Sequence, residues 1–278
     1  MANITAAEVN NLRKMTGAGM MDCKKALIDS DGDAEKAIDI LRKKGQKIAA
    51  KRADKAASEG VVLAATNDSG SFGAIVMVNC ETDFVAKNHD FVDFTQSILD
   101  LAIANSAKNI DELNGMDLNG RTVEENVSDQ MGKIGESIKL GGYAVVEAPK
   151  AFAYNHQGNR LATVLGLNLA DGEKISQVGH ELAMQVAAMN PVAVDKDDIE
   201  QSVIDKEIEI GKDQARQEGK PEEMLEKIAM GKLNKFMKEN TLLNQVFVRD
   251  GKKTVRQYLG ETEKNLSVTE FKRLMLGA

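Results

Sequence analysis

The sequence predicts an α+β protein: a small helical bundle, then two related halves built from antiparallel strands and helices. Three observations support this fold class. Residues 1–55 have only helical periodicity. Two later segments each combine apolar strands, a turn and an amphipathic helix, and residues 197–239 form two strongly charged helical runs. Strands grouped beside helices in this order are typical of α+β folds.

Residues 1–55 are expected to form three short helices, as in ubiquitin-associated domains. Thr5 and Glu8 fit a capping box, in which each side chain satisfies a backbone donor of the other residue. A Gly-rich break at 16–19 precedes a second helix from Met20, and Asp33 can cap the third. A bundle of this size alone would be only marginally stable.

A basic run follows in residues 42–55. Such a run can bind RNA, but it is more often a solvated helix or linker. The absence of aromatic residues from the run counts against RNA binding.

The first core half is expected to contain a β-hairpin and a helix. Residues 61–65 and 72–80 are apolar strands, and Asn67 to Gly70 is a turn sequence. The helix that follows carries apolar residues at spacings of three and four: Phe91, Phe94, Ile98 and Leu101.

The second half is expected to repeat this order. Strands at 143–146 and 161–169 would be joined by a turn at 154–160, and a helix would follow over 175–189. The segment 106–141 would join the halves and contain a helix over 123–138.

The last third of the chain predicts a protruding hairpin of two antiparallel helices, because the apolar residues in 197–218 and 222–239 are sparse. Residues 267–274 would return as a strand to the second half. The expected domains are therefore 1–55, 56–141 and 142–278, the last including a helical hairpin at about 195–240.

Composition narrows the functional classes. The chain of 278 residues has 43 acidic and 36 basic side chains, a net charge of −7, and no Trp. These values argue for a soluble protein and against dedicated nucleic-acid binding. The first twenty residues have no signal-peptide pattern, and no apolar run is long enough to cross a membrane. We expect a cytoplasmic protein with no membrane contact.

Sequence evidence for an enzyme is weak. A phosphate-binding loop motif is absent, and His89, His156 and His180 have no metal-ligand spacing. Two cysteines, Cys23 and Cys80, form no CxxC motif, and Cys80 is expected to be a buried structural thiol. We expect no cofactor and no bound metal.

The stretch from Cys80 to Asn88 is the most informative part of the chain. It follows an apolar strand and precedes a helical period, so Thr82 and Asp83 can cap a helix start. Phe84 would lie on the first turn, where its ring can tuck under the sheet or project outward.

Two long motifs resemble the bacterial translation elongation factor Ts family. Residues 12–27 (LRKMTGAGMMDCKKAL) are similar to its N-terminal signature, and residues 82–88 (TDFVAKN) to its second. Residues 133–136, the turn at 154–156, the charged hairpin and the C-terminal strand also match. The resemblance covers the whole chain.

This resemblance implies a guanine-nucleotide exchange factor for elongation factor Tu, the GTPase that carries aminoacyl-tRNA to the ribosome. It would bind the GDP-bound and nucleotide-free forms and be released when GTP binds. In this family the equivalents of Thr82, Asp83, Phe84 and Val85 dislodge the partner's Mg²⁺, with Phe84 as the inserted wedge and Asp83 orienting that contact.

Other partner contacts are implied for the bundle, through Leu12, Met20 and Met21, and for His156 in the second half. Leu12 can equally belong to the bundle core, whereas two adjacent methionines cannot both point inward from one helix. Ile134 and Gly135 resemble a position near the interface but fit internal packing equally well.

Several alternatives stay open. The chain could be a protein-binding adaptor with a ubiquitin-associated-like bundle and no effect on nucleotide, or it could bind RNA through residues 42–55. The helical hairpin either contacts elongation factor Tu or is dispensable, and dimerisation within that complex is open.

Overall fold

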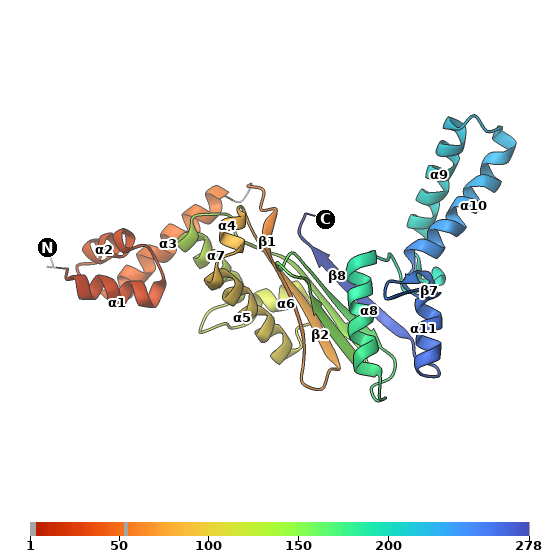
Figure 1. Cartoon of the computed structure of the whole chain (residues 1–278). Helices are drawn as coiled ribbons and strands as arrows, with labels where there is room; N and C mark the ends of the chain where they lie inside the picture. The colour runs from red at the N-terminus through yellow and green to blue at the C-terminus, as the bar shows by residue number, and fades with distance from the viewer. Residues whose placement is uncertain (1–3, 53–54, 278) are drawn as a thin grey trace.

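The computed structural model describes residues 4–52 and 55–277, and it confirms the predicted α+β class. A helical bundle lies at one end of the molecule, two sheets form the middle, and a helical hairpin projects beyond them (Figure 1). Within the described residues, no helix is both long enough and apolar enough to cross a membrane.

The bundle consists of α1 (Ala6–Thr16), α2 (Met20–Asp29) and α3 (Ala34–Arg52). The predicted capping box of Thr5 and Glu8 is present. The third helix is longer than expected, because it continues through the basic run as far as Arg52. The small apolar core of the bundle contains Val9, Leu12, Cys23, Ala26, Leu27 and Ala37.

The first sheet contains β1 (Glu59–Thr66), β2 (Phe72–Cys80) and β3 (Lys139–Glu147). These strands are antiparallel in the order β1-β2-β3. The predicted hairpin of residues 61–65 and 72–80 is confirmed, with Val62 opposite Met77.

The second sheet contains β4 (Lys150–Asn155), β5 (Leu161–Leu167) and β8 (Val268–Met275), in the order β4-β5-β8. The returning C-terminal strand is thereby confirmed. The predicted turn at 154–160 does lead into β5, but the prediction that it joins residues 143–146 to β5 was wrong. Residues 143–146 belong to β3, which pairs with β2, and the strand before the turn is β4.

Pro149 explains this difference. Residues 139–155 form one extended stretch that is interrupted at Ala148 and Pro149. Proline cannot donate a ladder hydrogen bond and ends a regular strand. The two parts of the stretch therefore join different sheets, and the predicted division at 141/142 falls inside β3. The three-domain division stays a prediction.

The remaining elements are mostly helices. Gly135, with φ of 84°, ends α7 at residue 134, four residues earlier than expected. The charged runs form the predicted antiparallel pair, α9 and α10. The elements not yet given bounds are α4 (Asp83–Ala86), α5 (His89–Asn105), α6 (Ile110–Gly115), α7 (Val123–Ile134), α8 (Ile175–Met189), η1 (Lys196–Asp198), α9 (Gln201–Gln217), α10 (Glu222–Asn240), η2 (Leu242–Asn244), β6 (Val246–Phe247), β7 (Asp250–Thr254) and α11 (Val255–Thr262).

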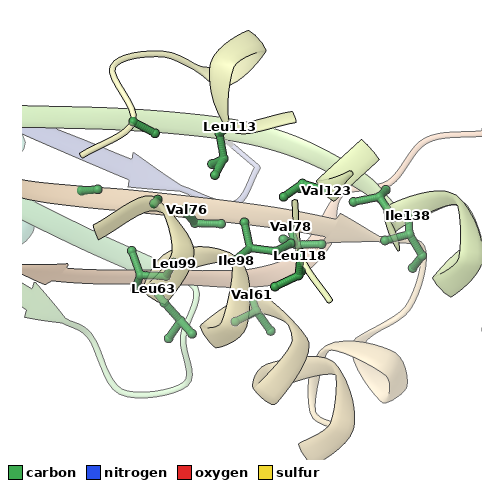
Figure 2. Close-up of a cluster of buried hydrophobic side chains, with 14 of the residues drawn as sticks. Val61, Leu63, Val76, Val78, Ile98, Leu99, Leu113, Leu118, Val123 and Ile138 are labelled. Carbon is green, nitrogen blue, oxygen red and sulfur yellow. The ribbon is translucent and has the colours of Figure 1, made fainter. Parts of the chain in front are cut away.

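The two sheets pack face to face, with helices on their outer sides. Val61 of β1 faces the core under α5, whereas Val62 faces a cluster shared with Val164 of the second sheet. Strands buried on both faces explain the continuous apolar runs in the sequence. Figure 2 shows Ile98 of α5 lying close to Val78 of β2 in the first of these cores.

We expect Ile98→Ala to lower the free energy of unfolding by about 3 kcal/mol, because it leaves a cavity in a fully buried site. Urea denaturation followed by circular dichroism measures this loss. Ile210→Ala is the matched control, because Ile210 is 38% exposed on α9. Equal losses in the two variants would contradict the core position of Ile98.

Candidate functional site

A single turn of helix, α4, presents an aromatic ring to solvent. The chain leaves β2 at Cys80, and Thr82 caps α4 by accepting a hydrogen bond from the backbone N–H of Val85 (3.5 Å). The Phe84 side chain is 84% exposed. Of the two orientations that the sequence allowed, the structure has the outward one.

The neighbours of Phe84 orient α4. Val85 is half-buried and packs against the core beneath the first sheet. Asp83 pairs with Lys87 one turn later (2.6 Å), and this hydrogen bond lowers the pKa of the Asp83 carboxyl. With Val85 directed inward, Phe84 is directed away from the protein.

Glu136, in the segment between α7 and β3, binds the turn before α4. Its Oε2 atom accepts hydrogen bonds from the backbone N–H groups of Glu81 (3.2 Å) and Thr82 (3.1 Å). The Thr82 hydroxyl donates to Oε1 (2.7 Å). Bonds to an ionised acceptor are stronger than neutral ones, so the cap residue is held in place.

Glu81 makes the reciprocal bond. Its Oε1 accepts from the backbone N–H of Ser137 (2.6 Å), and both carboxylate oxygens accept from the Arg52 guanidinium at the end of α3 (2.7 and 2.8 Å). The Ser137 hydrogen bond, assisted by Arg52, lowers the pKa of Glu81. The turn that carries Phe84 is therefore held by α3 and by the end of α7.

Cys80 is the buried structural thiol that the sequence predicted. Its side chain is fully buried, and Sγ donates to the Thr82 carbonyl (3.2 Å). Burial, followed by the nearby Glu136 carboxylate, raises the Cys80 pKa to about 12. A thiol with so high a pKa is a poor nucleophile near neutral pH.

The predicted residues of the bundle separate into two groups. Met20 and Met21 are 55% and 74% exposed at the start of α2, so both side chains are open to a partner. Leu12 lies in the bundle core at 2% exposure. The Leu12 side chain packs between the helices of the bundle and is not accessible to a partner, so its predicted role as a partner contact was wrong.

The other three predicted positions lie apart. Ile134 is half-buried against the first core, and Gly135 ends α7 just before Glu136. His156 is exposed beyond the end of β4, where its Nδ1 is 2.9 Å from the Tyr154 hydroxyl. The candidate site on α4 thus contains Thr82, Asp83, Phe84 and Val85. Ile134 and Gly135 directly precede Glu136, which binds the turn before α4, whereas His156 follows a strand of the second sheet.

The turn containing His156 is fastened to the edge of β1. Asn155 accepts from the Ala64 N–H (2.7 Å) and donates to the Ala64 carbonyl (2.9 Å). The carbonyl of Asn159 accepts from the Val62 N–H (2.7 Å). A cavity of about 580 Å³ lies beside the turn and is lined by Tyr154, His156, Leu161, Glu181, Met184, Gln185, Ala187, Ala188, Phe247, Val248 and Arg249.

Sequence reasoning missed the supporting residues of the site. Glu81 and Glu136 lie far apart in the chain, and no local pattern signals that each carboxylate accepts backbone hydrogen bonds from the other segment. Ile28 is 48% exposed on α2, and its spacing of seven residues from Met21 places both side chains on one helix face.

The fold and these surfaces define a class: an α+β protein that displays exposed apolar side chains on well-supported elements, the kind of surface that binds other proteins. Across the described residues, no group of three or more His, Cys, Asp or Glu side chains is placed to hold a metal ion.

Comparison with known proteins identifies the family. Residues 81–278 match the family model described as elongation factor TS. Proteins named elongation factor Ts are similar over nearly their full lengths: 51% identical in Amoebophilus asiaticus (99% of each chain), 49% in Christiangramia forsetii (100% of each) and 48% in Porphyromonas gingivalis (99% of each). The chain belongs to the elongation factor Ts family, a family of translation elongation factors.

The Glu81 bonds predict a pH dependence. Because the folded-state pKa of Glu81 is lowered, the ionised carboxylate stabilises the fold above its ordinary pKa of about 4.3, and this stabilisation is lost as pH falls through the lowered value. Glu81→Gln should therefore lower the melting temperature at pH 7, and the difference from wild type should shrink towards pH 3.

Differential scanning fluorimetry across this pH range tests the expectation. Glu124→Gln, an exposed substitution on α7, is the control and should leave the melting temperature nearly unchanged. A Glu81→Gln difference that stays constant with pH would contradict the assigned role.

Proposed function

We propose that this protein is a guanine-nucleotide exchange factor for elongation factor Tu. It would bind the GDP-bound form, promote GDP release, hold the nucleotide-free form and leave when GTP binds. One observation carries the proposal: in a chain of the elongation factor Ts family, an aromatic side chain that is 84% exposed stands on a turn held by several charge-assisted bonds.

The proposed mechanism uses Phe84 as a wedge. Inserting the ring near the partner's magnesium site would displace Mg²⁺ and disturb the phosphate-binding backbone, and both are needed to retain nucleotide. By linkage, a factor that lowers GDP affinity is itself displaced when nucleotide binds again. Support comes from the fixed turn, because a backbone that is already ordered loses little conformational entropy when its side chain is inserted.

Thr82, Asp83 and Val85 would hold the wedge in its binding orientation. Thr82 caps the turn, the Asp83–Lys87 pair lies on its outer side, and Val85 anchors it to the core. Met20 and Met21 would dock on another face of the same GTPase domain, because flexible methionines adapt to irregular apolar surfaces. His156 would contact a different domain of the partner.

This role requires no chemical step by the protein itself. Elongation factor Tu would provide the nucleotide site and the Mg²⁺, and this chain would contribute binding energy alone. We place this function in the cytoplasm, where translation elongation occurs, and assign the protein no direct nucleic-acid contact.

Phe84→Ala should reduce acceleration of GDP release by about 30-fold or more, because truncating an inserted aromatic hot spot costs about 2 kcal/mol or more. The measurement uses elongation factor Tu loaded with fluorescent GDP, chased with excess unlabelled nucleotide. Met224→Ala, which truncates a 45% exposed side chain on α10, is the control.

Two other outcomes are informative. If wild type and Phe84→Ala accelerate GDP release equally, the exchange function stands and the proposed insertion of Phe84 is wrong. If wild type binds elongation factor Tu without accelerating release, the exchange function is wrong and the protein is a binding adaptor.

Replacing both Met20 and Met21 by Ala should raise the concentration of this protein that gives half-maximal exchange, while the rate at saturation stays nearly the same. Lost docking contacts weaken binding without altering the wedge. Replacing Met224 and Met230, which are 45% and 42% exposed on the hairpin, is the matched control. A lower saturating rate with an unchanged half-maximal concentration would contradict the docking role.

A further inference from the structure

Two glycines bring α3 and α7 into direct backbone contact. Gly45 is buried near the middle of α3, and Gly132 lies in the last turn of α7. A Cβ atom added at Gly132 would lie 2.7 Å from the Cα of Gly45. A side chain at Gly132 would therefore force the two helices apart.

Glycine in a helix interior destabilises the helix relative to alanine. Both crossing helices nevertheless carry glycine where they meet. The close approach therefore sets how the bundle attaches to the core. A second contact lies nearby, because the Lys133 side chain extends over Gly17 at the end of α1.

The same two helices converge again at the turn before α4. Seven residues after Gly45, Arg52 binds the Glu81 carboxylate. Four residues after Gly132, Glu136 binds the Glu81 and Thr82 backbone. The helices α3 and α7 are thus joined at two points, at the glycine crossing and through the turn before α4, and we call this arrangement the frame. Figure 1 shows α4 beside the adjoining ends of α3 and α7.

We propose that the Gly45–Gly132 crossing is a positioning device that fixes the methionine surface of the bundle relative to Phe84. The inference rests on the proposed exchange function: a partner bound by Met20 and Met21 would meet Phe84 in one orientation, so docking energy would place the ring in the nucleotide site. Gly132 acts through this geometry and has no contact of its own with the partner.

The geometry can be tested without the partner. Spin labels at Lys25→Cys on α2 and Asp100→Cys on α5, both exposed positions, report the distance between bundle and core by double electron–electron resonance; the native Cys23 and Cys80 are fully buried. Gly132→Ala should shift or broaden the distance distribution. Gly45→Ala should preserve it, because its Cβ would lie 3.4 Å from Gly132, an ordinary contact distance.

A mid-helix glycine outside the frame supplies the control for helix propensity. Gly231→Ala on α10 adds a Cβ that meets nothing within 4 Å, so it should leave both distance and exchange unchanged. Should Gly132→Ala fail to fold, Arg52→Gln opens the frame at its other end without adding atoms, and the same broadening is expected.

Exchange kinetics supply the functional test. Gly132→Ala should lower the saturating rate of GDP release about tenfold or more, since small misplacements of a working group cost large factors in rate. In a Phe84→Ala background it should cause no further loss. Two results would overturn the positioning role. One is a distance distribution in Gly132→Ala that is as narrow as in wild type and unshifted; the other is an equal loss of exchange rate on adding Gly132→Ala to wild type and to Phe84→Ala.

Failure of the proposed function would look different. If wild type does not accelerate GDP release, the exchange role falls, while the distance measurement still decides whether the glycine crossing holds the bundle.

Discussion

The candidate site depends on the hydrogen bonds that the Glu81 and Glu136 carboxylates accept from backbone N–H groups. Glu136 accepts from Glu81 and Thr82, and Glu81 accepts from Ser137, so the end of β2 is fastened to the segment before β3. These bonds and the packing of Val85 against the core together fix α4, because a helix of one turn is not stable by itself. The polar groups behind the exposed ring are therefore hydrogen-bonded, and they hold the turn that carries Phe84.

The local sequence was sufficient for most elements and for the exposed residues that motifs mark. The capping box at Thr5, the first hairpin and the charged helix pair each depend on neighbours in the chain, and all three were predicted. The pairing of β5 with β4 was not predicted, because strands buried on both faces carry no alternation that distinguishes one partner from another. Pro149 was the available signal that residues 139–155 form two strands.

Tertiary contacts determine the orientation of Phe84, which the sequence left open. Whether Phe84 points inward or outward depends on Val85 filling the core and on Glu136 holding Thr82, and both are long-range effects. Leu12 illustrates the same limit: its motif implied a partner contact, yet its spacing of three residues from Val9 on α1 buries both in the bundle core. Hydrogen bonds between carboxylates and distant backbone groups, and close helix contacts at glycine, produce no periodic pattern that a single sequence could reveal.

The fastening of the His156 turn to β1 has a consequence for the behaviour of the protein in a crowded cell. An open strand edge is a template on which another chain can add a strand, and such pairing leads to aggregation. Asn155 satisfies both backbone groups of Ala64, and Asn159 satisfies the N–H of Val62. The end of β4 and the turn after it thus occupy this stretch of the β1 edge, so another copy of the chain cannot pair with it there.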